Sequence, residues 1–315
     1  MAPFVKADLI WFNGAFVPWD DARVHVMAHG LHYGTGVFEG IRSYATDDGP
    51  AVFRLDDHIT RLFASAALYE LEIPYSAAQL TAATLELLTR NRLDRTYIRP
   101  IAFFDAHSLT LWPRECPVSV AIAAMPLGAY LGEGLTKGVR VCISSVRRFD
   151  AAAIPTTGKA CGQYVNSVRA VQEALRRGFD EAIFLNQRGE VAEGSGENLF
   201  VIKGGAIVTN GEEADILPGI TRASVLELAS TLGIPATVRP LSVHDLTSAD
   251  ELFFTGTAAE VTPVVNVDGR PVGAGTPGTL TLRLQQAFFD VVHGRDPRFR
   301  RWLSFAPAAS AGVGS

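Results

Sequence analysis

Short apolar runs separated by turn residues dominate the beginning of the chain and predict strands. Apolar residues on both sides of Asn13-Gly14 predict a β-hairpin over 9–17, because this dipeptide accepts the positive backbone angles of a tight turn. The longest apolar run, 118–125, predicts a buried strand. It is far too short to cross a bilayer as a helix.

A further strand is predicted at 96–104, within which the period of two places Tyr97 and Arg99 on one face. An arginine inside a strand has two interpretations. It is a feature of a sheet edge, or it holds a carboxylate through two parallel hydrogen bonds.

Helical spacing of apolar residues begins after 53 and continues to 71. Asp56 or Asp57 is expected to cap this helix. Arg61 lies off the apolar stripe, so the pattern alone favours a solvated surface charge. Ser76 with Gln79 resembles a capping box that opens a second helix, which should end near residue 91.

The second half of the chain alternates strands and helices. The predicted elements are a strand at 139–146, a helix at 164–177 ended by Gly178, a strand at 181–186, a helix from about Thr221, and a strand at 251–264 that breaks at 256–258.

A chain of 315 residues exceeds the usual size of one domain, so two packed domains are expected. The stretch 126–138 contains four glycines and is the best candidate for a linker. We therefore predict a smaller N-terminal domain (1–127), a linker (128–138), a larger domain (139–305) and a flexible tail (306–315).

Composition narrows the possible partners. Hydrophobic residues make up 48% and charged residues 19% of the chain, as in globular proteins, and the formal net charge is −5. This balance gives no general attraction to nucleic acid or to an acidic membrane, so any anion site must be local. The three cysteines lack CxxC spacing, which argues against disulfides and zinc. Without a signal peptide, the chain is expected in the cytoplasm, with no bound metal.

Lys159 is the strongest candidate for chemistry, because it lies between small residues in the otherwise uncharged segment 154–165. A desolvated lysine loses its proton more easily and can form the Schiff base that pyridoxal phosphate (PLP) requires. Gly158, Ala160 and Gly162 would leave room for a flat ring. The alternative is a loop lysine with its amine in water, and this stretch alone does not decide between them.

Glu193 begins a glycine-rich turn within 191–200. A glutamate in such a turn is usually solvated. Beside a PLP ring it would instead hold the proton on the pyridine nitrogen, so that the ring can accept electrons from the substrate.

Two further turns offer backbone N–H groups to an anion. A Pro-Gly turn within 216–228 leads into a helix, whose free N–H groups and dipole suit a phosphate. The break at 256–258 adds N–H groups and a hydroxyl. Either signal alone is weak, since every helix has a beginning.

The segment 29–44 mixes glycines, aromatic residues and charges. Its simplest interpretation is a turn followed by a strand, with Phe38 in the core. Gly34, Gly36 and Gly40 would allow another backbone to approach closely.

Together these segments resemble the PLP-dependent aminotransferases of fold type IV, and within them the branched-chain amino acid aminotransferases. Six motifs carry the resemblance in family order between residues 10 and 289: HGLHYGTGVFEGIR, YIRPI, IPTTGKACGQYVNS, EGSGENLF, LPGITR and TGTAAEVTPV. The resemblance implies a two-domain α+β or α/β fold like that of D-amino acid aminotransferase. The N-terminal domain would be a smaller α/β domain, and the C-terminal domain would have a β-barrel-like core.

The resemblance also implies residue roles. Lys159 would bond covalently to PLP and carry the proton between the substrate Cα and the cofactor. The implied cofactor-binding residues are Arg61, Lys159, Tyr164, Glu193, Gly196, Leu217, Ile220, Thr221 and Thr257. The implied substrate-binding residues are Tyr33, Phe38, Gly40, Arg42, Tyr97, Arg99, Tyr130, Thr257 and Ala258.

The implied reaction is reversible transfer of the amino group of L-leucine, L-isoleucine or L-valine to 2-oxoglutarate. An aromatic pocket would favour the branched side chains, and Arg99 would accept the side-chain carboxylate of glutamate. The small-molecule partners are therefore amino acids and 2-oxo acids. The family also implies at least a homodimer, in which Tyr33 reaches the site of the partner.

Two departures from the family pattern bear on substrate range: the loop 103–113, which is poor in small residues, and Leu127. The alternatives within the fold are D-amino acid and (R)-amine aminotransferases and aminodeoxychorismate lyase. Glu39-Gly40 with Arg42, and Tyr97 with Arg99, favour the branched-chain group. A non-catalytic binding protein is a further alternative, but binding alone would require neither Lys159 nor Glu193.

Overall fold

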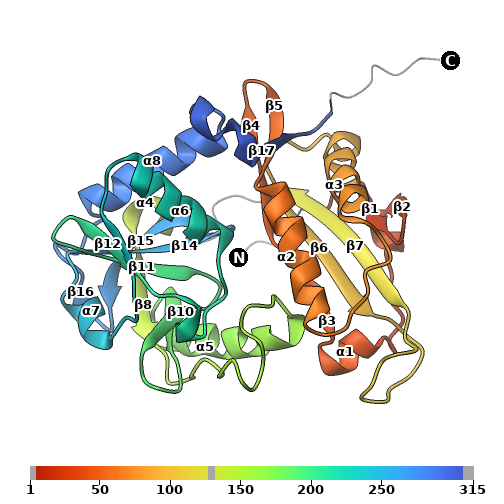
Figure 1. Ribbon diagram of the computed structural model, residues 1–315, viewed down its shortest axis with the longest axis horizontal. Coiled ribbons are helices and arrows are strands. Elements are labelled where there is room, and N and C mark those ends of the chain that lie inside the picture. The colour runs from red at the N-terminus through yellow and green to blue at the C-terminus, as the bar shows by residue number, and fades with distance from the viewer. Residues whose placement is uncertain (1–4, 127–131, 308–315) are drawn as a thin grey trace. The chain divides into compact units, whose positions relative to one another are not determined.

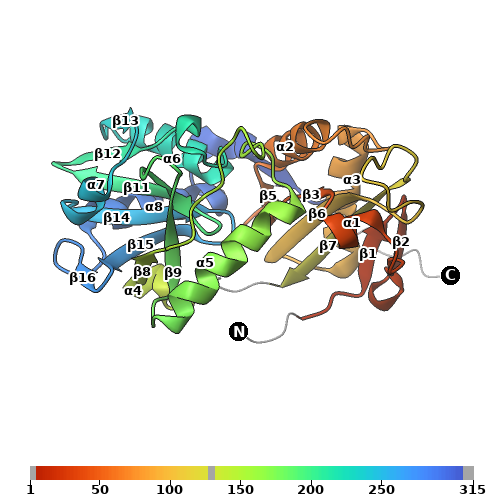
Figure 2. The same cartoon turned by 90° about the horizontal axis from the view of Figure 1, so that it is seen from below.

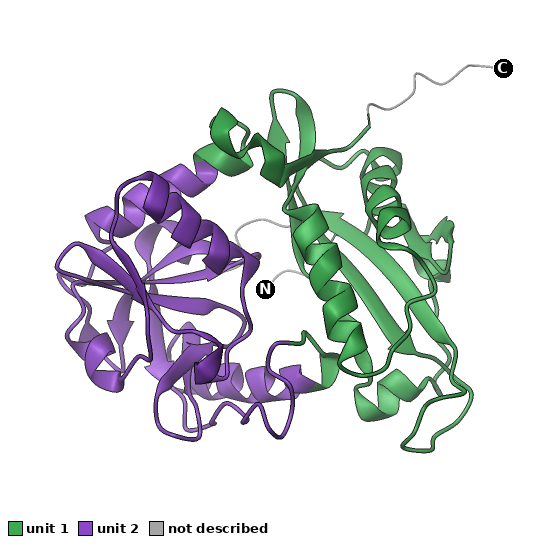
Figure 3. Ribbon diagram, viewed as in Figure 1, with its two compact units in different colours: residues 1–127, 158–162, 290–315 green, residues 128–157, 163–289 purple. Residues whose placement is uncertain are grey.

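The computed structural model describes residues 5–126 and 132–307 of a chain that forms two compact units (Figure 3). Unit 1 joins residues 1–127, 158–162 and 290–315, and unit 2 joins residues 128–157 and 163–289. Chain order alone had assigned 158–162 and 290–305 to the second domain. Leu127, Tyr130 and the tail from residue 308 lie outside the described residues.

The described strands of unit 1 form one antiparallel sheet of eight strands. The strands are β1 (Leu9–Phe12), β2 (Ala15–Pro18), β3 (Gly36–Phe38), β4 (Ile41–Thr46), β5 (Gly49–Phe53), β6 (Thr96–Phe104), β7 (Val118–Pro126) and β17 (Leu303–Phe305). Their order is β17-β5-β4-β6-β7-β1-β2, and β3 also pairs with β6.

Two amphipathic helices cover one face of this sheet (Figures 1 and 2). The helical elements of unit 1 are η1 (Trp19–Asp21), α1 (His29–Tyr33), α2 (Leu55–Ala67), α3 (Ala77–Asn91) and η4 (Pro297–Trp302). Leu62 of α2 and Leu87 of α3 are fully buried together with Ile98 of β6. This burial of apolar side chains between helix and sheet holds α2 against β3. The backbone of Lys159 forms hydrogen bonds with both elements.

Unit 2 is built on a second sheet of nine described strands, which curves into a half-barrel. The strands are β8 (Val139–Ile143), β9 (Glu181–Leu185), β10 (Val191–Gly194), β11 (Asn198–Lys203), β12 (Ala206–Thr209), β13 (Ala236–Val238), β14 (Glu251–Gly256), β15 (Glu260–Val267) and β16 (Arg270–Pro271). Their order is β10-β9-β8-β15-β14-β11-β12-β13, and β16 pairs with β15.

Helices surround this sheet, so its central strands are buried on both faces. The helical elements are α4 (Gly134–Lys137), η2 (Cys161–Gln163), α5 (Tyr164–Arg176), η3 (Glu212–Ala214), α6 (Ile220–Thr231), α7 (Val243–Thr247) and α8 (Thr279–Val292); η2 and α8 each extend across a boundary between the units. In β9, Ile183 belongs to one apolar cluster, whereas Ala182 and Phe184 pack with Ala170 and Ala174 of α5. The period of two thus places alternate side chains in two separate cores.

The sequence predicted the elements with strong local signals. The hairpin around Asn13-Gly14 is confirmed, and both residues have positive φ. The capping box of Ser76 and Gln79 is also confirmed, with α3 ending at Asn91. Strand β6 has the predicted bounds.

Three local predictions need correction. Neither Asp56 nor Asp57 caps α2, because Arg54 occupies the N-cap position with φ 53° and both aspartates lie inside the first turn. The segment 29–44 begins with the short helix α1, which the turn-and-strand prediction did not include. The expected linker contains the helical turn α4, and the strand expected over 139–146 already ends at Ile143.

Candidate active site

Unit 1 holds the backbone of Lys159 between α2 and β3. Its N–H donates to the Ser65 hydroxyl at 2.9 Å, and its C=O accepts from the Phe38 N–H at 3.0 Å. The next residue, Ala160, continues this pairing as an antiparallel bridge to Val37. The lysine segment therefore behaves as an extra strand position beside β3, which fixes where its side chain starts.

The amine of Lys159 lies against an aromatic wall. Its Nζ is 5.0 Å from the centroid of the Phe38 ring. Gly34 permits the tight approach of this segment, because a Cβ there would lie 2.7 Å from the Gly162 Cα and its φ is +69°. These contacts fix the backbone of Lys159 and place its amine beside Phe38, while the chemical role of the amine stays a prediction.

Arg61 is held by Glu39, a carboxylate with no exposed surface. Arg61 Nε donates to Oε1 at 2.7 Å and Nη2 donates to Oε2 at 2.9 Å. The side chain of Arg61 is only 13% exposed, so the surface charge suggested by the helical pattern is wrong. A two-pronged ion pair fixes the plane of the guanidinium.

His58 completes this cluster, with Nδ1 2.7 Å from Glu39 Oε2. Burial would raise the pKa of Glu39, but Arg61 and His58 outweigh burial and hold this pKa well below its usual range. Burial lowers the pKa of His58, and Glu39 only partly opposes this effect. The neutral imidazole therefore donates its Nδ1–H to an ionised carboxylate.

An aromatic and cationic cluster adjoins Phe38. Arg99 Cζ lies 4.6 Å from the Phe38 centroid and 5.0 Å from the Tyr97 centroid, and Arg99 Nη2 donates to the Tyr97 hydroxyl at 3.0 Å. A Cβ on Gly40 would approach that hydroxyl to 2.1 Å. The structure thus brings together Phe38, Gly40, Tyr97 and Arg99 with Lys159, a combination of apolar surface and positive charge.

Two other predicted substrate residues also belong to unit 1. Tyr33 is 45% exposed and its hydroxyl donates to the Leu109 C=O at 3.0 Å. Arg42 is buried on β4, with Cζ 5.7 Å from the Tyr44 centroid. Arg42 is paired with Tyr97 across β4 and β6, so the two residues share one face of the sheet and Arg42 adjoins the cluster around Phe38. The Tyr33 hydroxyl instead contacts the loop that contains Leu109.

In unit 2 the carboxylate of Glu193 is buried and held by three donors. Leu217 N–H and Asn198 Nδ2 donate to Oε2 at 3.0 Å and 3.3 Å, and Arg148 Nη2 lies 3.0 Å from Oε1. Only 6% of Glu193 is exposed, so the solvated alternative is wrong. Donors to a carboxylate favour its charged form.

The turn after Glu193 is closed by Glu197, which is also buried. Gly194 N–H donates to the Glu197 C=O at 2.7 Å, and Gly196 N–H donates to its Oε2 at 3.0 Å. A Cβ on Gly196 would meet nothing within 4 Å. The predicted cofactor residue Gly196 is therefore at a position with open space beside the backbone.

Helix α6 presents an N-terminus without a side-chain cap. Its N-cap is Gly219, and a Cβ there would lie 1.9 Å from Asn198 Oδ1. Ile220 and Thr221 form the first turn of this helix of 12 residues. Asn198 also donates to the Leu217 C=O at 2.9 Å, so one side chain connects the Glu193 carboxylate with the turn before the helix.

The remaining predicted residues of unit 2 lie at ends of elements. Tyr164 is the first residue of α5. Thr257 and Ala258 form the turn between β14 and β15, as predicted. In unit 2 the structure joins Glu193 directly with Leu217, and places Ile220 and Thr221 just after it along the chain.

Sequence reasoning gave no role to three residues that hold the predicted ones. His58 precedes Arg61 by one helical turn, and that spacing is the signal that could have linked them. Asn198 follows the predicted turn directly. Arg148 lies in the loop that follows β8. It is only 5% exposed, and no sequence pattern predicts that burial.

The described residues were also compared with the requirements of a membrane-spanning helix and of a metal site. None of their helices is both long and apolar enough to cross a membrane. Among them, no group of three or more histidine, cysteine, aspartate or glutamate side chains is arranged to hold a metal ion.

Comparison with known proteins gives the class of protein that this fold and this set of residues define. Residues 36–267 match the family model of class IV amino-transferases, and the chain belongs to this family. Its predicted fold, that of the fold type IV enzymes, is confirmed by similarity to solved structures across nearly the whole chain.

Particular relatives are branched-chain-amino-acid aminotransferases. The Pseudomonas aeruginosa enzyme is 45% identical over 295 residues, which are 93% of this chain and 96% of that protein. The Escherichia coli enzyme is 46% identical over 300 residues, covering 95% and 97%.

Solved structures give relatives of the same kind. The crystal structure of the E. coli branched-chain amino acid aminotransferase has a TM-score of 0.94 and 45% identity, and the match covers 96% of this chain and all of that one. The branched-chain amino acid aminotransferase from Thermobaculum terrenum, solved in its PLP-form, has a TM-score of 0.89 and 33% identity, with coverage of 95% and 98%.

Proposed function

We propose that this protein is a PLP-dependent branched-chain-amino-acid aminotransferase. It transfers the amino group of L-leucine, L-isoleucine or L-valine to 2-oxoglutarate and runs in both directions. The observation that carries this proposal is the similarity to branched-chain enzymes at 45–46% identity over 93–95% of the chain. The buried and hydrogen-bonded state of the predicted chemical groups supports it.

The residues present fit PLP by their chemistry. The cofactor requires an amine for its aldehyde, an acceptor for its ring nitrogen and donors for its phosphate. Lys159 offers the amine, and Glu193 offers a carboxylate that three donors hold. Arg61, the uncapped start of α6 at Ile220 and Thr221, and Thr257 offer donors of the kind that phosphate takes.

When bound, PLP supplies an electron-accepting ring that carries the amino group between the two substrates. Lys159 then acts as the base and acid that moves the proton at the substrate Cα. Phe38 keeps water from one side of its amine. Glu193 holds the proton on the ring nitrogen, and Tyr164 and Leu217 complete the contacts to the ring.

Specificity follows from the cluster around Phe38. Its aromatic surface suits branched aliphatic side chains, whereas Arg99 at 4.6 Å from the Phe38 centroid suits the side-chain carboxylate of glutamate. Gly40 keeps the Tyr97 hydroxyl in place beside Arg99, because any side chain there would displace it. Thr257 and Ala258 hold the substrate α-carboxylate.

We also propose a homodimer or a higher homo-oligomer in the cytoplasm. Tyr33, a predicted substrate residue, is 45% exposed in the single chain, as expected for a side chain that completes the site of a neighbouring copy. The described cysteines are all free, which suits a reducing compartment.

The test uses the Lys159→Ala variant and two amino acids. Wild-type protein loaded with PLP should change its visible absorbance with L-leucine and not with D-alanine, when no acceptor is present. Lys159→Ala should lose transamination by several orders of magnitude, because it removes the group that moves the Cα proton.

Control variants keep this test specific. Lys137→Ala removes an exposed lysine that pairs only with Glu133 in the described structure, and it should retain full activity. A response to D-alanine alone would move the enzyme to another subgroup. Full activity of Lys159→Ala would end the proposed mechanism.

A further inference from the structure

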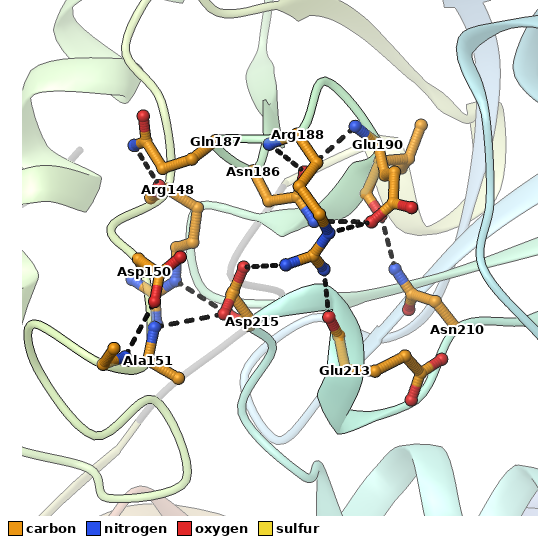
Figure 4. A network of polar contacts seen from close by, with 12 residues as sticks. Arg148, Asp150, Ala151, Asn186, Gln187, Arg188, Glu190, Asn210, Glu213 and Asp215 are labelled. Carbon is orange, nitrogen blue, oxygen red and sulfur yellow. Dashed lines mark hydrogen bonds and ion pairs between the residues drawn. The ribbon is translucent and has the colours of Figure 1, made fainter.

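Arg148 is a buried arginine whose backbone is fixed on both sides. It is 5% exposed and follows β8. Its N–H donates to the Leu185 C=O at 2.9 Å, and its C=O accepts from Gln187 Nε2 at 2.8 Å (Figure 4). Its Cζ lies 4.2 Å from the centroid of the Phe149 ring. The guanidinium is therefore held in a dry place, where an ion pair is stronger than in water.

Two groups share the guanidinium. Nη2 lies 3.0 Å from Glu193 Oε1, and Nε donates to the backbone C=O of Asp215 at 3.4 Å. The two contacts use different nitrogens of the guanidinium. Arg148 thus connects the carboxylate proposed to bind the cofactor ring with the turn that contains Asp215.

Asp215 is itself fixed in an uncommon conformation. Its φ is +64°, in the left-handed region, and its Oδ1 accepts from the Ala151 N–H at 3.1 Å (Figure 4). Arg188 Nη1 lies 3.8 Å from Oδ2. The side chain of Arg188 is half exposed, and its described contacts are with Glu190, Glu213 and Asp215. Arg188 belongs to the same network as Arg148, but its described contact in that network is with Asp215 and not with Glu193.

We propose that Arg148 is a positioning residue for the cofactor, because it holds the Glu193 carboxylate ionised and in one orientation. This inference rests on the proposed function. A carboxylate with only 6% exposure needs charged or polar donors to remain ionised. The backbone N–H of Leu217 and the amide of Asn198 are neutral donors, whereas Arg148 supplies a full charge.

The experiment measures the affinity of the cofactor-free protein for PLP, followed by the absorbance of the bound cofactor. Arg148→Met keeps volume and removes charge, and it should weaken PLP binding about tenfold or more, as expected for the loss of one hydrogen bond to a charged group. Arg148→Lys should fall between wild type and Arg148→Met. Arg188→Met, the matched control, should bind PLP like the wild type.

A double-mutant cycle separates this role from general support of the fold. If Arg148 acts through Glu193, then Arg148→Met should weaken PLP binding no further in a Glu193→Gln background. The absorbance maximum of bound PLP should also shift in the same direction in Arg148→Met and Glu193→Gln.

Three outcomes would overturn the inference: wild-type affinity in Arg148→Met, equal losses in the two backgrounds, or an equal loss in Arg188→Met. Where Arg148→Met does not fold, the same cycle with Arg148→Lys decides. If Glu193→Gln alone leaves both PLP affinity and absorbance unchanged, it is the assigned role of Glu193, and thus the proposed site, that fails.

Discussion

Each unit contains a buried carboxylate paired with an arginine, and the two pairs are built in opposite senses. In unit 1, Glu39 is completely buried and accepts from Nε and Nη2 of Arg61 and from His58, while the Arg61 side chain keeps 13% exposure. In unit 2, Arg148 Nη2 lies 3.0 Å from Glu193 Oε1, and Arg148 Nε donates to the Asp215 C=O.

The difference shows which member of a pair is the support. Glu39 serves Arg61, which we assign to the cofactor phosphate, whereas Arg148 serves Glu193, which we assign to the ring nitrogen. In both pairs, the residue that we assign to the cofactor is held by its ion-pair partner. A buried ion pair by itself is weak evidence for stability, so orientation of the functional member is the better explanation for each pair.

The largest effect on stability is expected from Glu39→Gln. This change leaves Arg61 without a counter-charge in a mostly buried place, and should lower the free energy of unfolding by about 3 kcal/mol. Urea denaturation of the cofactor-free protein measures it. Glu86→Gln removes a carboxylate that pairs with Arg90 at the surface, and should cost about 0.5 kcal/mol or less. Equal losses in the two variants would contradict the structural role of Glu39.

A somewhat smaller loss, about 2–3 kcal/mol in the cofactor-free protein, is expected from Glu193→Gln, because it leaves the buried guanidinium of Arg148 without its carboxylate. The glutamine can still accept from Leu217, and Arg148 keeps its hydrogen bond to Asp215. The same urea experiment compares this variant with Glu39→Gln. If Glu193→Gln proved the more destabilising of the two, the distinction drawn between the pairs would be wrong.

The smallest effect concerns pH and His58. Because burial lowers the pKa of His58 in the folded protein, the unfolded chain binds its proton first, and stability should fall as the pH drops below the ordinary value of 6.5. The lowered pKa of Glu39 acts in the same direction, at pH values below its ordinary 4.5. Acid should therefore destabilise unit 1 in two stages.

His58→Asn tests the first stage, since an amide can replace the Nδ1–H donor but does not titrate. The unfolding free energy of this variant should change less than that of the wild type between pH 7 and pH 5, a window set by the ordinary histidine pKa. His107→Asn, at an exposed histidine, is the control. A wild-type pH dependence in His58→Asn would show that other groups cause the loss.

Sequence reasoning succeeded where the signal is local. The turn at Asn13-Gly14 and the capping box at Ser76 each depend on residues within three positions of one another. The apolar stripe predicted helix α2 correctly, but it placed Arg61 on the solvated surface. Arg61 is held by Glu39, which lies 22 positions earlier on the chain. No local pattern reports such a partner.

The same limit applies to unit 2. Glu193 could be proposed only through resemblance, since its donors come from Arg148, Asn198 and Leu217, which the fold alone brings together. The prediction of an aspartate as the N-cap of α2 was wrong for a different reason. Arg54 adopts a left-handed conformation that sequence rules reserve mainly for glycine and asparagine.

The attachment of 158–162 to unit 1 joins the two units through the chain itself. The backbone of Lys159 bonds to Ser65 of α2 and to Phe38 of β3, which both belong to unit 1. The residues on both sides of 158–162 belong to the other unit. The segment that carries the proposed cofactor lysine therefore takes its backbone hydrogen bonds from one unit and its chain connections from the other.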